Sequence, residues 1–337
     1  MDFFIGKPIE HDKKLNNAIQ GNSFGFLVNY NYINHKKSTF NKLYTYPERG
    51  YSFLYQNFNS TVLGEVYGSY RHFTYNLTPS KNSALKLTTA FGLGYATKKY
   101  DAISNNQNIA IGTNLLVSGY LKLNYFQYAL NEKLQINTGI SLLHFSNVSI
   151  KSPNLGINTV SAHLGVRYNL QETAPLNSIE KDKTSFPKQP IHFNLVLRGG
   201  YNESLIENSG RFPFYTVSAY GSKQLNAYST ITGGVDFFDS KFLKNHIKYI
   251  NSTENSNYNP SDYKRVGVFI GHELTQHKFA FVSQLGYTVY SHYPYVSKVY
   301  ERFGFKHQIN AHLFTEIGLK VNLFRAEALE FGIGYKF

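Results

Sequence analysis

A histidine and a serine stand two residues apart near the middle of the chain, as His144 and Ser146, in a stretch where apolar and polar residues alternate. On an extended strand such residues face the same side, with Cα atoms about 6.6 Å apart, so their side chains can converge. An imidazole beside a hydroxyl is the pair that serine hydrolases use, with histidine as base and serine as nucleophile. The spacing therefore predicts a candidate site for nucleophilic catalysis.

The side on which the pair lies follows from the parity of its strand. His144 and Ser146 alternate in step with Leu142 and Ile140, and on the returning segment Asn158 belongs to the apolar set. We therefore expect the three polar groups to meet on the outward, apolar face of a sheet, at a strand end next to a long loop. Polar groups on such a face have a free-energy cost, and a lipid substrate would give a reason for it.

Period-two alternation runs through almost the whole chain and predicts strands. In 84–96, for example, Leu85, Leu87, Phe91 and Leu93 alternate with small or polar residues. Fifteen such segments can be placed, and a sixteenth near 2–8: these are 24–33, 49–58, 61–74, 84–97, 113–128, 132–146, 158–170, 190–202, 213–223, 227–239, 262–274, 277–290, 298–306, 310–322 and 325–337.

The connections between these segments alternate between short turns and long loops rich in Asn, Ser and Lys, as in bacterial outer-membrane barrels. Small and polar residues on the second face suit a wet lumen, aromatic residues recur at strand ends, and the last segment ends on Phe337. A soluble β-sandwich would show the same alternation with the apolar face turned inward. We predict an all-β fold: a single transmembrane antiparallel up-and-down β-barrel of 14–16 strands, in the bacterial cell outer membrane.

One polar segment, 172–189, divides the chain into parts of about eight strands each, 1–171 and 190–337. Two separate barrels are possible. Strand edges must close in lipid, and one continuous barrel needs only a long turn at this segment. We therefore expect an N-terminal and a C-terminal half of one barrel.

Composition excludes several other classes of protein. The 337 residues include 28 Tyr and 27 Phe but no Cys or Trp, so disulfide scaffolds, thiolate metal sites and cysteine nucleophiles are absent. No apolar run is long enough for a spanning helix. The net charge of +13 is spread thinly, which suits a solvated surface or lipid phosphates, and we expect no nucleic-acid partner. The first residues lack a visible secretory signal, as in a mature form or a protein made without export.

The segment 142–158 resembles the motif of the PagL-type lipid A 3-O-deacylases, which are outer-membrane serine esterases. That motif reads His-aromatic-Ser-Asn, then a short loop ending Pro-Asn-x-Gly, then an acidic residue two places after the glycine. The match here is carried by His144, Phe145, Ser146, Asn147, Pro153, Asn154 and Gly156. The first half, 1–170, also looks like the longer acyloxyacyl-hydrolase relatives of Bacteroidetes-type bacteria, which the stretches Tyr46-Pro47-Glu48-Arg49-Gly50 and Tyr335-Lys336-Phe337 fit as well.

The resemblance implies a nucleophile at Ser146, a general base at His144, and an oxyanion hole from Asn154 with loop amides near Asn147 and Gly156. It departs from the family at the third member, where this chain has Asn158 in place of a glutamate. An amide can hold the tautomer of an imidazole, but it does not stabilise the imidazolium as a carboxylate does.

Three functions remain open at this point. The first is hydrolysis of an ester-linked acyl chain on lipid A or another outer-leaflet lipid. The second is a catalytically impaired barrel that serves as an accessory subunit with other outer-membrane proteins, and the third is a passive pore. We expect no metal and no cofactor, because the histidines form no metal-binding cluster.

Other titratable residues are interpreted as having no role in catalysis. Glu273 has lumen parity. His272 has outward parity and is either a second interfacial polar residue or simply a histidine near a strand end, the interpretation we favour. Asp236 and Asp239 are interpreted as ordinary strand-end acids.

Overall fold

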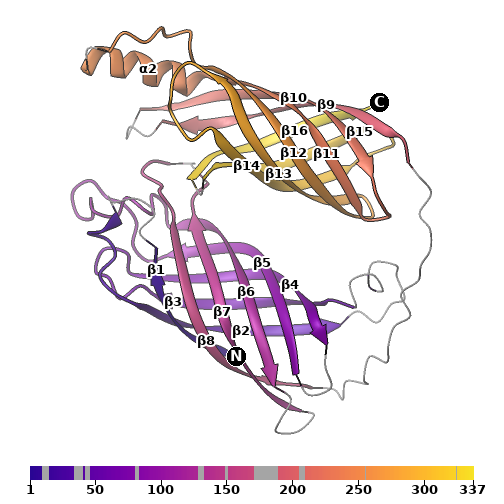
Figure 1. Cartoon of the computed structure of the whole chain (residues 1–337). Coiled ribbons are helices and arrows are strands. Elements are labelled where there is room, and N and C mark those ends of the chain that lie inside the picture. The colour runs from indigo at the N-terminus through magenta and orange to yellow at the C-terminus, as the bar shows by residue number, and fades with distance from the viewer. Residues whose placement is uncertain are drawn as a thin grey trace. The chain divides into compact units, whose positions relative to one another are not determined.

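The computed structural model describes residues 1–9, 15–33, 41, 46–79, 83–127, 133–148, 151–170, 189–204, 209–254, 256–323 and 325–337. Within these residues the chain forms two closed antiparallel barrels (Figure 1). It divides into two compact units, Met1–Asn147 with Pro153–Lys183, and Val148–Ser152 with Thr184–Phe337.

The first barrel contains eight strands in chain order, each paired with its neighbours. They are β1 (Asp2–Pro8), β2 (Ser23–Ile33), β3 (Glu48–Asn57), β4 (Glu65–Pro79), β5 (Ser83–Ala96), β6 (Leu115–Gln127), β7 (Leu134–Ser146) and β8 (Ile157–Tyr168). It closes where β1 pairs with β8, from Asp2 opposite Gly165 to Pro8 opposite Thr159.

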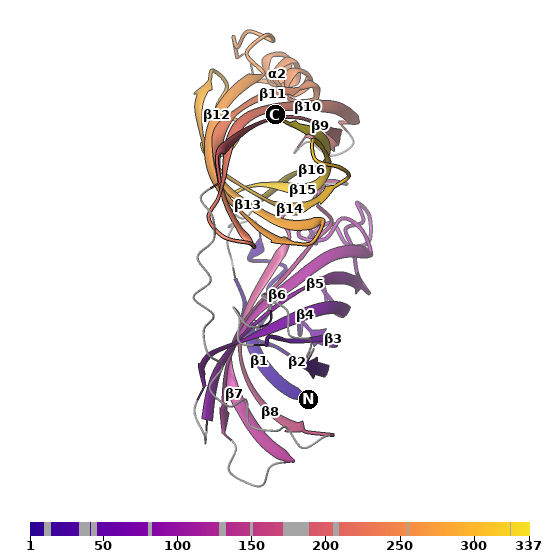
Figure 2. The same ribbon diagram turned by 90° about the vertical axis from the view of Figure 1, so that its right-hand side faces the viewer.

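The second barrel repeats this plan, and Figure 2 shows its strands as a closed ring. Its strands are β9 (Ile191–Glu203), β10 (Arg211–Gln224), β11 (Ser229–Ser240), β12 (Lys264–Gln276), β13 (Phe279–Ser291), β14 (Val299–Gln308), β15 (Leu313–Asn322) and β16 (Arg325–Lys336). It closes where β16 pairs with β9, as in Ile333 opposite Leu197.

The prediction of a single barrel of 14–16 strands is therefore wrong. The all-β class and the antiparallel up-and-down order are confirmed, and every predicted segment corresponds to a strand. Alternation describes each strand alone and is the same in one large barrel or two small ones, whereas closure depends on which distant strands share hydrogen bonds. The predicted linker 172–189 lies outside the described residues except at Gln189.

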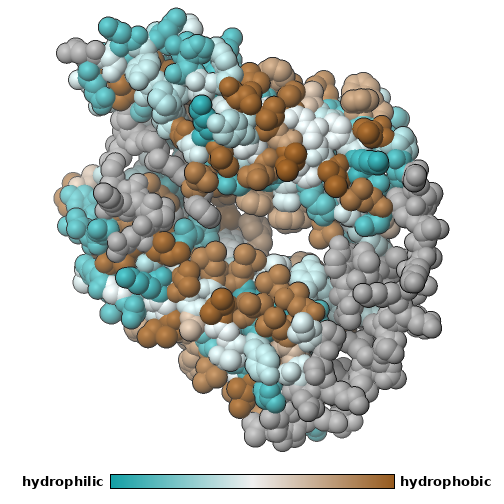
Figure 3. Space-filling model, in the orientation of Figure 1, coloured by the Kyte–Doolittle hydropathy of each residue, from teal (hydrophilic) through white to brown (hydrophobic). Residues whose placement is uncertain are grey.

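The apolar side chains of both barrels point outward. Leu164 in the first barrel and Ile270 in the second remain 62% and 69% exposed. In Figure 3 hydrophobic residues gather over the strands of each barrel, and hydrophilic residues cover α2. This is the reverse of a soluble barrel, which buries such residues.

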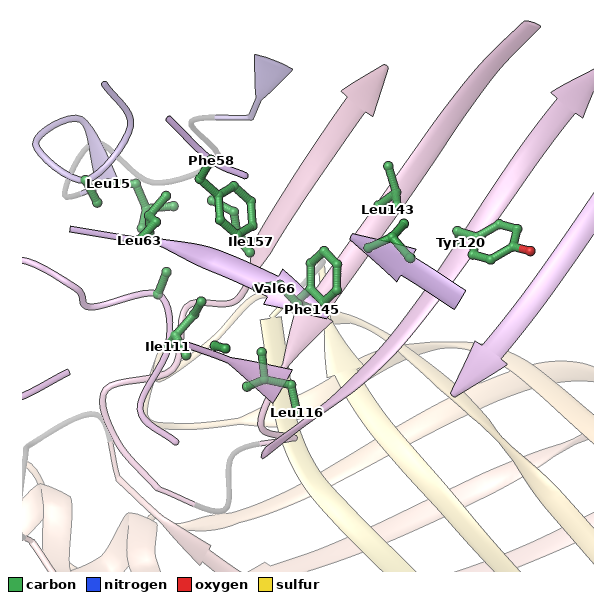
Figure 4. Close-up of a cluster of buried hydrophobic side chains, with 14 of the residues drawn as sticks. Leu15, Phe58, Leu63, Val66, Ile111, Leu116, Tyr120, Leu143, Phe145 and Ile157 are labelled. Atoms are coloured by element: carbon green, nitrogen blue, oxygen red, sulfur yellow. The ribbon is translucent and has the colours of Figure 1, made fainter. Parts of the chain in front are cut away.

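The interior of the first barrel holds polar groups along the strands and an apolar cluster at one end. Among the polar groups, Lys86 and Arg167 both contact Glu48, at 2.6 and 2.8 Å. Phe58 and Phe145 meet edge to face in the apolar cluster, with ring centroids 6.2 Å apart (Figure 4). This cluster packs the inner side of the end of β7, where the predicted site lies.

The interior of the second barrel is lined with buried ion pairs. Arg302 contacts Asp236 at 3.1 Å and Glu330 at 2.5 Å. Lys306 contacts Glu273 at 3.0 Å, which confirms the lumen parity of Glu273. Asp236 is fully buried in this network, so its interpretation as an ordinary strand-end acid is wrong.

One long connection contains a helix that the sequence interpretation treated as loop. The helix α2 (Lys241–Thr253) joins β11 to β12 and buries Phe242, Leu243 and Ile247 against the end of the second barrel. In the part of the chain that the structure describes, no helix is long and apolar enough to cross a bilayer.

Candidate active site

Two neighbouring strands bring His144 and Asn158 together. The two residues are direct partners in the register between β7 and β8. Their side chains meet with His144 Nδ1 2.7 Å from Asn158 Oδ1. Because a carbonyl oxygen only accepts, Nδ1–H is the donor, and Nε2 is the ring nitrogen left to act as a base.

The amide of Asn154 connects the serine to the loop between β7 and β8. Its Nδ2 donates to Ser146 Oγ at 2.9 Å. Its Oδ1 accepts from the backbone N–H of Asn147 at 3.0 Å. One side chain therefore holds both the serine and the residue that follows it.

Gly156 lies directly against the histidine and the serine. A Cβ at this position would stand 3.3 Å from His144 Cε1 and 3.6 Å from Ser146 Cβ, so both side chains border the same small space. The backbone of Gly156 has φ +72°, a conformation that residues with a side chain rarely adopt. Glycine is thus needed here both for its conformation and for the room it leaves.

The site lies on the outward face of the strands but is covered. Along β7, Ile140 and Leu142 are 59% and 38% exposed, and His144 is half-buried. Ser146 and Asn158, of the same parity, are only 3% and 9% exposed. The predicted interfacial triad therefore lies under the loop that follows β7 rather than on open strand surface.

The loop between β5 and β6 supports the loop between β7 and β8. Leu155 N donates to Ile109 O at 3.1 Å, and Gly156 N donates to Ala110 O at 3.0 Å. Asn108, completely buried, holds this segment: its Oδ1 accepts from Ile111 N at 3.2 Å, and its Nδ2 donates to Val62 O at 3.1 Å.

Sequence reasoning missed this support because it depends on contacts between distant loops. The only local signal was a run of asparagines followed by small apolar residues within 105–111.

The contacts also reduce the number of predicted donors that could form an oxyanion hole. The backbone N–H groups of Asn147 and Gly156 already donate, to Asn154 Oδ1 and Ala110 O. Of the predicted donors, Asn154 Nδ2 is the one that points at the serine oxygen. An amide within reach of Oγ is also close to where the oxygen of an attacked carbonyl would stand.

Two family models match this chain. Residues 25–167 match the family described as lipid A 3-O-deacylase (PagL). Residues 191–337 match the family described as acyloxyacyl hydrolase, C-terminal domain. The matched ranges follow one another along the chain and correspond to the two barrels. The chain belongs to the PagL family.

Other comparisons add little to the PagL assignment. No curated protein matches the chain. Among solved structures, a mutant porin of Rhodopseudomonas blastica matches at 8% identity, over 100% of this chain and 98% of the porin, with a TM-score of 0.20. CdiB from Acinetobacter baumannii matches at 10% identity over 100% of this chain and 59% of CdiB, with a TM-score of 0.21. Scores this low support no argument about this chain.

The PagL domain contains all the candidate residues described above. In the described part of the second barrel, a serine and a histidine also meet, with Ser229 Oγ 2.6 Å from His272 Nε2. This pair joins β11 to β12 across the outward face. His272 thus has the predicted outward parity and a hydrogen-bonding partner on the neighbouring strand.

Among the residues that the structure describes, no group of three or more His, Cys, Asp or Glu side chains could hold a metal ion.

Proposed function

We propose that this protein is an outer-membrane serine esterase that removes an ester-linked acyl chain from lipid A. Ser146 is the nucleophile, His144 the general base, and Asn158 the group that orients the imidazole. The observation that carries the proposal is the 2.7 Å hydrogen bond between His144 and Asn158. It fixes the tautomer in which Nε2 of His144 carries the lone pair, and His144 and Ser146 share one face of β7.

The reaction follows from these contacts. His144 Nε2 takes the proton of Ser146 Oγ as Oγ attacks the ester carbonyl. Asn154 Nδ2 donates to the oxyanion that forms. As the ester C–O bond breaks, the imidazolium returns its proton to the sugar oxygen, and the acyl group stays on Ser146. A water molecule, deprotonated by His144, then releases the free fatty acid and regenerates the serine.

Both barrels are proposed to sit in the bacterial outer membrane, with the site near the lipid headgroups. The exposed apolar side chains around each barrel support this, because leaving them in water is costly. The site lies at the barrel end that carries the long β5–β6 connection; at the opposite end β4 is joined to β5 and β6 to β7 by short connections, and β2 is joined to β3 by the longer connection 34–47. In outer-membrane barrels short turns face the periplasm, so the site end would face the outer leaflet, where lipid A resides.

The experiment is to incubate the folded, detergent-solubilised full chain with lipid A and to analyse the lipid by mass spectrometry. We expect loss of one hydroxy fatty acid, and we expect Ser146→Ala to abolish this without unfolding the barrel. Ser229→Ala is the matched control, because Ser229 also contacts a histidine on an outward face. Intact lipid A after long incubation, or equal loss of activity in both variants, would reject the proposal.

A non-catalytic role is the second candidate, favoured by Asn158 standing where the resemblance expects a carboxylate. In that case the barrel acts as an accessory subunit of an outer-membrane complex. Copurification of stable partners in mild detergent, together with an unchanged lipid A profile in a deletion strain, would support this role over catalysis.

A further inference from the structure

The two ends of the second barrel differ in their connections. At one end the turns are short, at residues 225–228, 277–278 and 309–312, and the barrel's first and last strands begin and end there. The opposite end carries α2 (Figure 1). By the usual arrangement of outer-membrane barrels, the short-turn end faces the periplasmic leaflet.

Basic side chains gather at the short-turn end. We call this set the basic rim: Lys223, Lys278, Lys336, His192, His272, His277, His307 and His312. Lys223, His277, Lys278 and His312 are exposed, and the others are half-buried.

The carboxylate side chains described at this end point into the lumen rather than toward the basic rim, and one rim member, His192, contacts the main-chain oxygen of Phe337 at 3.2 Å. Glu273 points into the lumen, where it contacts Lys306 at 3.0 Å. Glu316, further up the same lumen, contacts Arg198 at 2.7 Å. The rim therefore presents Lys223 and Lys278 to the surroundings without exposed acidic side chains beside them among the described residues, and Lys336 lies half-buried at the mouth of the lumen.

Aromatic side chains place the basic rim at the level of lipid headgroups. His307 stacks on Phe279 with ring centroids 4.6 Å apart, and His312 stacks on Tyr335 at 5.4 Å. Phe279 is 59% exposed. Such girdles of aromatic residues lie at the boundary between hydrocarbon and water in membrane barrels. The cations of the rim are thus expected beside lipid phosphates.

At the opposite end of this barrel, lysines have acidic residues as neighbours. Lys241 contacts Asp239 at 2.8 Å, and Glu254 is exposed nearby. The lysines of α2 and of the start of β12 therefore share their surface with acids. The concentration of unbalanced positive charge is specific to the short-turn end.

We propose that the basic rim of the second barrel binds anionic glycerophospholipid headgroups of the periplasmic leaflet. The lysine ammonium groups supply the charge, and the imidazole N–H groups add hydrogen bonds to phosphate oxygens. The C-terminal barrel thereby gains a role of its own as a lipid-binding anchor. This role depends on membrane insertion but not on catalysis at Ser146.

The test uses the full chain in detergent mixed with equal amounts of phosphatidylglycerol and phosphatidylcholine, with bound lipid counted by native mass spectrometry. We expect wild type to retain phosphatidylglycerol preferentially at low salt. A triple variant, Lys223→Gln, Lys278→Gln and Lys336→Gln, should lose this preference, at roughly fivefold per lysine. The matched control is Lys244→Gln, Lys248→Gln and Lys264→Gln at the opposite end, which should keep it.

Retained preference in the rim variant, or an equal loss in the control variant, would overturn the proposal. Heat-modifiable migration on gels checks that both variants are folded. Ser146→Ala should bind phosphatidylglycerol as wild type does, so a failure of the proposed catalytic function would leave this result unchanged.

Discussion

At the residue scale, Asn158 is the partner of His144, the proposed base. Its Oδ1 accepts the Nδ1–H of His144, so it holds the tautomer that a base needs. A neutral amide does not balance the charge of the imidazolium that forms during the reaction. In the serine protease that serves as the general example, replacing the triad aspartate by asparagine costs about 10⁴ in rate, because the wrong tautomer results. Here the tautomer is kept, so the expected penalty is smaller.

Asn158→Glu should therefore raise the rate of acyl release from lipid A, by about 10²-fold. The carboxylate would replace the amide opposite His144 and stabilise the imidazolium. Mass spectrometry of lipid A over a time course measures the change. Asn158→Ala is the matched control and should be slower than wild type. Equal rates for Asn158→Glu and wild type would contradict a role for this residue in orienting the base.

At the scale of elements, the β7–β8 loop of the candidate site is held by the β5–β6 loop, which contains none of the proposed catalytic residues. The β5–β6 loop holds Leu155 and Gly156 through backbone hydrogen bonds, and Asn108 holds that loop. Asn108→Ala should lower kcat by about 10²-fold, because small displacements of reacting groups are costly. Asn105→Ala is the matched control, since Asn105 also donates to Val62 O but does not contact Ile111.

The Asn108 prediction is checked by steady-state kinetics on lipid A. A fall in kcat with little change in KM for Asn108→Ala, and a smaller effect for Asn105→Ala, is the expected result. If Asn108→Ala is folded and fully active, the loop does not position the site.

The docking of α2 is expected to depend on pH through His246. His246 packs against Tyr293 and Tyr295, with ring centroids 5.8 and 4.9 Å apart. Desolvation there lowers its pKa from 6.5, and Glu254 opposes this only in part. The docked helix therefore favours neutral imidazole. This contribution is fully present above pH 6.5 and is lost as the pH falls toward the lowered pKa.

Hydrogen exchange of the amides in 241–253 measures this effect, with rates corrected for the intrinsic dependence on pH. Protection of α2 should decrease below about pH 6.5, and His246→Phe should remove most of that dependence. Strands β10 and β12 serve as the internal reference. Unchanged protection of α2 between pH 7 and pH 5 would contradict the expectation.

At the scale of the whole molecule, each barrel closes on itself. Closure of the first barrel between β1 and β8 uses no strand from the second. A fragment of residues 1–183 should therefore fold in detergent as a heat-modifiable barrel and retain measurable deacylation of lipid A. Circular dichroism and lipid A mass spectrometry test this. A fragment that remains unfolded would show that the first barrel needs the second.

Neither barrel is expected to conduct ions. An eight-stranded barrel has an interior just wide enough for side chains. Here those side chains are buried ion pairs and hydrogen-bonded groups, such as Arg302 with Asp236 and Ser141 with Ser161. Planar-bilayer recordings of the full chain should show no steady conductance. Stable open channels would instead support the passive-pore hypothesis.

Alternation along the chain determined the strands and their outward faces, because the period of two is a local property of extended backbone. It also determined that His144 and Asn158 share a face, and the motif spacing identified the family. Tertiary structure alone decided how the strands close. Pairing of β1 with β8, and of β9 with β16, joins residues far apart in the chain, and alternation is equally compatible with one barrel or two.

The covering of the site was likewise decided only by tertiary structure. Parity placed Ser146 on an apolar surface, yet Ser146 is only 3% exposed, and Asn154 and Gly156 of the β7–β8 loop lie against it. Ala110 meets Gly156 because two loops at one barrel end share backbone hydrogen bonds, which no local pattern records. The sequence by itself thus identified the candidate residues and the face they share, whereas the packing of distant loops decided their surroundings.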